Sequence, residues 1–209
     1  MRGDTVILFA RAPRLGTVKR RLAREVGAMA ALRFHRAQLR RLLRLLGRDR
    51  RWRCELAMTP DRARWPTGLA RAVPMRPQGR GDLGQRMGRA LARHRRAVLV
   101  GCDIPQLGPA DIAAAFRALG RARAVFGPAE DGGYWLVGFG PRRPPAPFAA
   151  VRWSSEHALA DTLRNCAGHP VALLRRLRDV DDAAGLRALG RASGADPVQV
   201  DTLERTKML

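Results

Sequence analysis

The residues best suited to chemistry lie in polar segments that directly follow apolar runs of the sequence. In the segment Gly101-Cys-Asp-Ile-Pro-Gln-Leu107, Asp103 comes soon after the apolar residues 97–100. A carboxylate at the end of a strand suits Mg²⁺ or Mn²⁺, which prefer oxygen ligands and bridge to substrate phosphates. The alternative is a cap for the helix expected from Pro109, but that helix begins too far along the chain for a direct cap. We therefore predict that Asp103 binds a divalent metal ion.

A second carboxylate ligand is expected from Asp179-Val-Asp-Asp182, which also follows a strand-like run. Asp181 is the candidate within this segment, so the predicted metal ligands are Asp103 and Asp181. The spacing fits another role equally well, in which Asp181 or Asp182 only caps the last helix.

The loop from Phe9 to Leu22 could hold phosphate, because it leads into an expected helix with cations in its first turn. Free N–H groups at a helix N-terminus, reinforced by cations, bind phosphate. Lys19 is the only lysine before Lys207 in an arginine-rich chain, which indicates a need for a compact ammonium group facing phosphate. The alternative is a solvated basic helix start. The predicted nucleotide- and phosphate-binding residues of this loop are Phe9, Arg11, Gly16, Lys19 and Arg21.

The segment from Gly127 to Gly138 contains Asp-Gly-Gly-Tyr and could hold a ribose or sugar. Asp131 and Tyr134 can bond to sugar hydroxyls, while Gly132 and Gly133 allow close approach of the backbone to a ligand. The alternative is an ordinary β-hairpin, because Asp-Gly is a strong turn signal.

Two further positions have both a structural and a functional interpretation. Asp82 stands before an expected helix and either caps it or also contacts the nucleotide. Trp153 is either a buried aromatic residue or part of the sugar and acceptor side. Ser154 or Ser155 is interpreted as the N-cap of the following helix, because no base that could activate a nucleophile is identifiable nearby.

Strand-like and helix-like segments alternate along the chain, which predicts an α/β protein of three layers, with helices on both faces of a mostly parallel central sheet. Ligands of such sheets bind beyond the carboxyl ends of the strands, where the polar segments lie. We expect Thr17 to cap the first helix and the residues after Gly194 to be loosely ordered. The expected strands are residues 5–10, 53–58, 97–102, 122–126, 134–139 and 171–174, the expected helices are 18–25, 29–46, 83–94, 109–119, 155–165 and 182–189, and residues 65–68 and 74–81 are expected to form turns.

The 209 residues suit a single domain. Apolar runs are too short to span a membrane and no secretion signal is recognisable, so we expect a cytoplasmic protein. The net charge of +22 comes from arginines spread along the whole sequence, which we interpret as solvated surface charge rather than a nucleic-acid site. Cys54, Cys102 and Cys166 are expected as buried apolar residues, and the four histidines as surface or helix-face residues, because their spacing predicts neither disulfides nor a zinc site.

The polar segments 9–22, 78–87, 101–107 and 127–138, with Trp153-Ser-Ser155 and Asp179-Val-Asp181, have the order and spacing of a bacterial family of GT-A-like glycosyltransferases. The sequence resembles this family over about residues 4–190. The family is described as uncharacterised or as arsenosugar-biosynthesis-type glycosyltransferases, and is related to phospholactate guanylyltransferase. The resemblance implies a nucleotide-diphospho-sugar transferase fold, with Lys19 on the phosphate side and Asp103 on the metal side. The family's Lys-Thr-Arg is Lys19-Arg-Arg21 here, and the pattern following Asp181 also departs from the family.

The expected function is metal-dependent transfer of a sugar from a nucleotide-sugar to a small-molecule acceptor. Asp103, Lys19 and Asp131 are the predicted catalytic residues, with Asp131 or Glu130 as the general base of an inverting reaction. One alternative keeps the fold and transfers a nucleotidyl group from a nucleoside triphosphate with release of pyrophosphate. Another is a protein without enzymatic activity that binds nucleic acid or other polyanions. The oligomeric state is left open.

Overall fold

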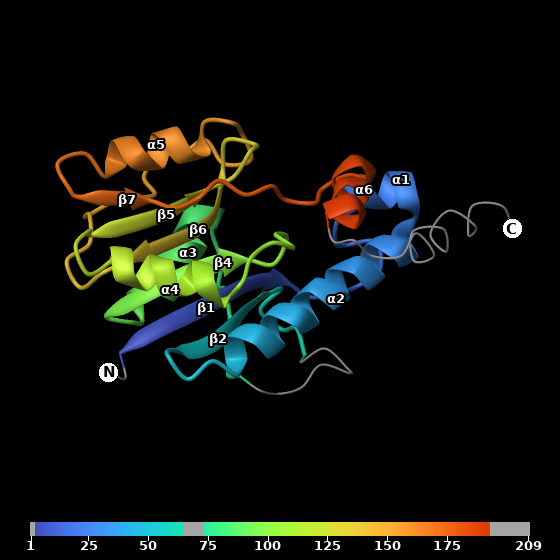
Figure 1. Ribbon diagram of the computed structural model, residues 1–209, viewed down its shortest axis with the longest axis horizontal. Coiled ribbons are helices and arrows are strands. Elements are labelled where there is room, and N and C mark those ends of the chain that lie inside the picture. The colour runs from blue at the N-terminus through green and yellow to red at the C-terminus, as the bar shows by residue number, and fades with distance from the viewer. Residues whose placement is uncertain (1–2, 65–72, 193–209) are drawn as a thin grey trace, which may run out of the picture.

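The computed structural model describes residues 3–64 and 73–192, and its centre is a seven-stranded sheet of order β3-β2-β1-β4-β6-β5-β7 (Figure 1). Most strands are runs of Val, Leu, Ile and Ala that are buried on both faces, as is usual for a parallel sheet. All neighbouring strands are parallel except the two pairs that include β6. The strands are β1 (Asp4–Arg11), β2 (Arg53–Thr59), β3 (Met75–Pro77), β4 (Arg96–Gly101), β5 (Ala124–Pro128), β6 (Tyr134–Phe139) and β7 (Val171–Leu173).

Helices cover both faces of the sheet. Successive residues of a strand point to opposite faces, so the apolar residues of these strands need a covering layer on each side. Val6 and Leu8 of β1 pack in one core with the apolar sides of α2 and α4, and Ile7 packs in the other with α3 and residues of α5. Figure 1 shows α1 and α6 beside the start of α2, beyond the end of the sheet. The helices are α1 (Arg20–Val26), α2 (Ala28–Gly47), α3 (Leu83–Ala92), α4 (Pro109–Ala118), α5 (Ala158–Asn165) and α6 (Ala183–Ala192).

The antiparallel strand β6 decides where the candidate site lies. Because β6 runs against its neighbours, its first residue Tyr134 pairs with Pro128 at the end of β5. Its next residues pair with the end of β4, where Leu136 lies opposite Val100. The β5–β6 hairpin loop therefore lies at the same edge of the sheet as the carboxyl end of β4.

The predicted three-layer α/β fold with a mostly parallel sheet is confirmed, but three local predictions are wrong. Residues 75–77 form β3, which pairs with β2 inside a segment that was expected to be turns. The first helix begins at Arg20, and the Thr17 hydroxyl donates to Arg14 O instead of capping it. Helix α5 begins at Ala158, because Ser155 Oγ donates to Arg152 O and His157 occupies the cap position.

Residues 65–68 and those after 194 lie outside the described part of the chain, so the predictions made for them are not assessed. Within the described ranges, no helix has the length and apolar character needed to cross a bilayer.

Candidate functional site

A cavity of about 470 Å³ opens at the edge of the sheet where β4 and β5 end and β6 begins. Its walls come from the segment after β4, the β5–β6 hairpin, the residues before α5 and the residues before α6. The acidic and aromatic side chains of these segments give it a polar and an apolar part. Its polar lining residues are Arg21, Asp103, Asp131, Tyr134, Ser154, Ser155, Glu156, Asp179 and Asp181, and its large apolar ones include Leu83, Met87, Ile104, Trp135 and Trp153.

Lys19 joins the two predicted metal ligands. Its ammonium group lies 3.0 Å from Asp103 Oδ1 and 2.7 Å from Asp181 Oδ1, and it also donates to the carbonyl oxygen of Val180. The Lys19 side chain is only 4% exposed, whereas the two aspartates are 45% and 46% exposed. The ammonium thus lies behind the carboxylates and holds them together, and the predicted contact of Lys19 with phosphate stays a prediction.

The backbone and the charge state of Lys19 both reflect this position. Its φ of 47° and ψ of 49° are left-handed, a conformation that is unfavourable for a residue with a Cβ and is typical of functional sites. Burial alone would lower the pKa of Lys19, but the nearby Asp103 and Asp181 outweigh it and raise the pKa. Lys19 thus remains charged, and it marks the point where the chain bends into α1.

The structure separates the two roles that the sequence left open for Asp181 and Asp182. Asp182 caps α6, because its Oδ1 accepts a hydrogen bond from Gly185 N at 2.7 Å. Asp181 binds Lys19 and lines the cavity. Asp179, two residues earlier, also lines the cavity, so alternate residues of this extended segment face the same space.

The cavity has a surplus of negative charge. Five of its lining residues are carboxylates, namely Asp103, Asp131, Glu156, Asp179 and Asp181, and Arg21 is the only basic residue in the lining that the structure describes. Burial and the neighbouring carboxylates of Asp181 and Asp131 raise the pKa of Asp179 to about 6. Oxygen ligands with unbalanced negative charge fit a hard divalent cation. The residues present are thus suited to Mg²⁺ or Mn²⁺.

The β5–β6 hairpin is packed tightly against the segment before α5. Gly132 has a φ of +84°, and a Cβ placed on it would lie 2.2 Å from the carbonyl oxygen of Glu156. Leu159 N donates to Gly132 O at 3.0 Å, and Asp131 Oδ1 accepts from Gly133 N at 2.9 Å. The hairpin interpretation is correct, and the hairpin also supplies Asp131 and Gly133 to the cavity wall.

Tyr134 and Trp153 both line the cavity and belong to one aromatic cluster with Phe148 and Phe126. The hydroxyl oxygen of Tyr134 is buried, and burial raises the pKa of this group. The ring rather than the hydroxyl is therefore available to a ligand, and the predicted hydrogen bond to a sugar would require the side chain to move.

Other predicted binding residues are not among those that line the cavity. Asp82 forms a capping box with Gln85 at the start of α3, which is the structural role considered for it. Phe9 packs against the core, while Arg11 and Gly16 are exposed. Gly132 stands behind its lining neighbours. Their predicted roles in binding the nucleotide, phosphate or sugar stay predictions.

Sequence reasoning missed several residues that the fold brings to the site. Glu156 and Asp179 had not been singled out, although alternation around Asp181 was a usable signal for Asp179. His35 was expected as a surface or helix-face residue; it lies on the buried face of α2, and its Nδ1 atom is 3.9 Å from Cys102 Sγ. The two residues are 67 positions apart, so spacing along the sequence could not indicate their contact.

Known structures share this fold. A protein from Desulfovibrio desulfuricans, named as a candidate nucleotide-diphospho-sugar transferase, is 29% identical with a TM-score of 0.85, over 92% of this chain and 88% of that chain. Two others share only the fold. Rv0371c from Mycobacterium tuberculosis, in a complex with manganese, is 20% identical with a TM-score of 0.50, over 90% of this chain and 97% of its own. The 4-diphosphocytidyl-2C-methyl-D-erythritol synthase from Anaerococcus prevotii is 10% identical with a TM-score of 0.51, over 83% of this chain and 89% of that chain.

The structure thus has the GT-A-like fold of the nucleotide-diphospho-sugar transferase superfamily, as the sequence resemblance implied. None of the curated proteins matches the sequence. The model of a bacterial family of uncharacterised proteins, DUF2064, matches residues 42–155, which include β4, the β5–β6 hairpin and the strand-end residue Asp103. Because this match spans more than half of the chain, the protein belongs to the DUF2064 family.

Proposed function

We propose that the protein transfers a sugar from a nucleotide-diphospho-sugar to a small-molecule acceptor, with Mg²⁺ or Mn²⁺ as cofactor. One observation carries the proposal: at the carboxyl ends of the strands, Lys19 holds Asp103 and Asp181 together at the wall of an acidic cavity. Sheets of this kind bind their ligands at that edge. The similarity to the Desulfovibrio protein favours the same substrate class.

Asp103 and Asp181 would hold the metal ion. Lys19 contacts Oδ1 of each carboxylate and so holds the two proposed ligands side by side. When bound there, the metal ion supplies positive charge that stabilises the departing nucleoside diphosphate. Lys19 is then a positioning residue, which orients the two ligands and keeps their negative charges close together.

The other lining residues suit the substrate. Arg21 supplies a cation for phosphate oxygens, and the rings of Trp153 and Tyr134 offer apolar surface to a sugar or acceptor. Asp131 is the proposed general base: it accepts the proton of the acceptor hydroxyl, whose oxygen bonds to the anomeric carbon as the bond to the diphosphate breaks. Glu130 is the weaker candidate, because it is not a lining residue and lies 3.7 Å from Arg178.

The charges of the cavity favour sugar transfer over nucleotidyl transfer. A nucleoside triphosphate brings more negative charge than a diphospho-sugar, whereas Lys19 is already engaged by carboxylates and Arg21 is the only basic residue in the described lining. The products separate the two reactions. Release of a nucleoside diphosphate from an activated sugar supports our proposal, and release of pyrophosphate from a triphosphate contradicts it.

Replacement of Asp103 by Asn tests the metal site. In the wild type, calorimetry should show that a nucleoside diphosphate binds at least about tenfold more tightly with Mn²⁺ than with a chelator. In Asp103→Asn the two affinities should nearly coincide. Asp182→Asn is the control, because it removes a nearby carboxylate that caps α6 instead of lining the cavity, and it should keep the metal dependence. The same metal-dependent gain in Asp103→Asn would remove Asp103 from the metal site.

We also propose the cytoplasm as the compartment. All three cysteines are free, which suits a reducing environment.

A further inference from the structure

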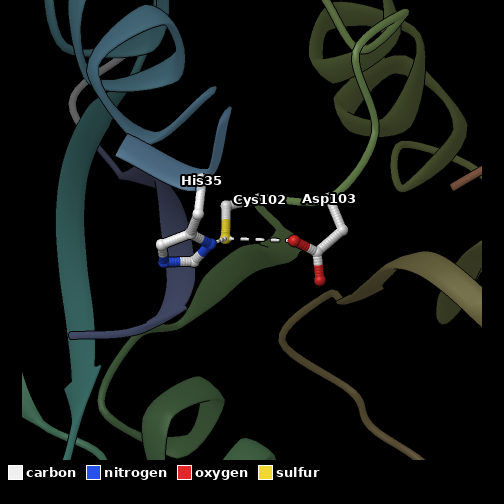
Figure 2. A group of neighbouring side chains, drawn as sticks. All are labelled: His35, Cys102 and Asp103. Carbon is white, nitrogen blue, oxygen red and sulfur yellow. Dashed lines mark hydrogen bonds between the residues drawn. The ribbon is translucent and has the colours of Figure 1, made fainter. Parts of the chain in front are cut away.

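A second group of possible metal ligands lies next to the cavity. His35 comes from α2, and Cys102 and Asp103 directly follow β4 (Figure 2). Figure 2 shows the three side chains pointing toward one another, with Cys102 in the middle. Cys102 Sγ lies 3.9 Å from His35 Nδ1 and 3.7 Å from Asp103 Oδ1, and all three ligand atoms lie within 4.8 Å of one another.

A backbone contact fixes the orientation of the histidine ring. His35 Nε2 lies 2.9 Å from the carbonyl oxygen of Arg11, which can only accept a hydrogen bond. The proton of the neutral ring is therefore on Nε2, and Nδ1 presents its lone pair toward Cys102. Histidines that bind metals usually donate their other ring N–H to a carbonyl or carboxylate in this way.

The types and separations of these atoms select the metal. One nitrogen, one sulfur and one oxygen suit Zn²⁺ or Co²⁺, whereas Mg²⁺ and Ca²⁺ prefer oxygen alone. Tetrahedral zinc with ordinary bond lengths places such atoms about 3.3–3.6 Å apart. The two separations from Cys102 Sγ, 3.7 and 3.9 Å, need to shorten by a few tenths of an ångström, and the His35 and Asp103 ligand atoms, which lie within 4.8 Å of each other, have to approach as well.

The charges of the three ligands and of the adjoining Lys19–Asp181 ion pair also balance when a divalent ion binds. A Cys102 thiolate, Asp103 and Asp181 carry three negative charges, and a divalent ion with the ammonium of Lys19 carries three positive charges. Without the ion the buried thiol keeps its proton, so binding releases one proton to solvent. His35 and Cys102 are each only 3% exposed, but Asp103 lines the cavity, which gives an ion a route from solvent.

We propose that His35, Cys102 and Asp103 form a three-ligand site for Zn²⁺ or a similar borderline-soft ion, which overlaps the proposed Mg²⁺ site. Three protein ligands leave a fourth position for water or substrate, as in many zinc enzymes. Asp103 belongs to both sites. A consequence that rests on the proposed function is that Zn²⁺ competes with Mg²⁺ or Mn²⁺ for this carboxylate and inhibits transfer.

Titration of the untagged, metal-free protein with Co²⁺ tests the site without any assay of the reaction. We expect one equivalent of Co²⁺ to produce a near-ultraviolet band from thiolate coordination, which Zn²⁺ then removes. Cys102→Ser should abolish the band, and His35→Gln should weaken Co²⁺ binding at least about tenfold, since loss even of outer partners costs that much. Cys166→Ser and His94→Gln are the controls, because these residues lie outside the group, and both should keep the band. Co²⁺ binding without the band, or a band that persists in Cys102→Ser, overturns the proposal.

A second measurement uses the wild type alone and so does not depend on the folding of variants. X-ray absorption of the protein with one equivalent of Zn²⁺ should show one sulfur and two or three nitrogen or oxygen neighbours at the lengths usual for zinc. A shell of nitrogen and oxygen only would assign the ion to the carboxylates of the cavity and overturn the proposal. Either outcome leaves the Mn²⁺ dependence of nucleotide binding as a separate test of the proposed function.

Discussion

Lys19 shows how one residue can have an indirect role at a charged site. Its ammonium is buried, but its two carboxylate partners are almost half exposed at the cavity wall. Without Lys19, the negative charges of Asp103 and Asp181 would repel each other, and the segment before α6 would lose its two hydrogen bonds from the Lys19 ammonium. The lysine therefore stabilises the arrangement that a metal ion would use.

Lys19→Ala should lower the free energy of unfolding by about 2 kcal/mol, less than for a fully buried ion pair because solvent screens the carboxylates. Mg²⁺ should then raise the melting temperature of the variant more than that of the wild type, since the cation can replace the missing positive charge. Thermal unfolding with and without Mg²⁺ measures both effects. Arg20→Ala is the control, because Arg20 is exposed at the neighbouring position. An equal effect of Mg²⁺ on wild type and Lys19→Ala would contradict the shared site.

The sequence was informative about single residues near strand ends and less so about their partners. Asp103 and Asp131 were found because polar residues after apolar runs lie at one edge of a parallel sheet, and both line the cavity. The partner of Lys19 could not be derived in the same way, because Asp181 is 162 positions away. That contact also explains why α1 begins later than predicted, since Lys19 is held in a left-handed conformation before it.

At the scale of elements, the cavity depends on the contact between the β5–β6 hairpin and the segment before α5. Gly132 is the point of closest approach, where its positive φ and the backbone of Glu156 both exclude a side chain. Gly133 differs, because a Cβ there would meet only the side chain of Asp131, at 3.1 Å. The two neighbouring glycines therefore allow a matched comparison.

Gly132→Ala should reduce the free energy of unfolding by about 2 kcal/mol or more, because the left-handed conformation and the contact with backbone are both unfavourable. Gly133→Ala should cost clearly less, since the side chain of Asp131 can move. Chemical denaturation of the two variants measures the difference. Similar losses in both would show that the hairpin does not depend on its contact with Glu156.

The segment before α5 is also held by an ion pair. Arg152 donates from Nε and Nη2 to the Asp161 carboxylate at 2.8 Å each, and from its backbone N at 3.1 Å. These hydrogen bonds hold the pKa of Asp161 well below its usual value of 3.8. Arg152 directly precedes Trp153, so the pair anchors one wall of the cavity.

Asp161→Asn should destabilise the protein at neutral pH, and the loss should shrink in acid. Because the pKa is lower in the folded state, the ionised Asp161 contributes its stability above about pH 3.8 and loses it as the pH falls toward the folded pKa. Melting temperatures from pH 7 to pH 2.5 should therefore converge for variant and wild type. Glu156→Gln, on the same segment but 80% exposed, should change little over that range. If the melting temperatures of Asp161→Asn and wild type instead differed by the same amount at every pH, the hydrogen bonds of Asp161 would stabilise the protein independently of its charge.

Helices and strands were predicted well where the local sequence pattern determines them. They were predicted poorly where pairing with a distant segment or a single side-chain contact determines them. Buried runs such as residues 97–100 are recognisable as strands from composition and bounding turns. The three-residue strand β3 has no such signal, because it exists only through its pairing with β2. The start of α5 was misplaced for a different, local reason, because the Ser155 hydroxyl donates to Arg152 O, three positions earlier, instead of capping the helix.

At the scale of the whole molecule, the net charge of +22 does not gather on one element. Arginines lie on every helix of residues 3–64 and 73–192, and these helices cover both faces of the sheet and its end. This distribution differs from the single basic face of a specific nucleic-acid binder.

Binding to a random duplex should accordingly be weak and steeply salt-dependent, with a dissociation constant above about 1 μM at physiological salt. Fluorescence anisotropy over a range of salt concentrations measures it, with two duplexes of unrelated sequence compared under the same conditions. Submicromolar binding that differs between the two duplexes at physiological salt would favour a nucleic-acid function.

The pairing of β1 with β4 also has a consequence for how the protein is made. Residues Val6, Ile7 and Leu8 are fully buried, yet their partners Val98, Leu99 and Val100 are synthesised about 90 residues later. Until then, one edge of β1 has no strand beside it, and such an open apolar edge can pair with other chains. Fragments that end before Arg96 should therefore aggregate, and during synthesis this edge of β1 should stay exposed until β4 has emerged.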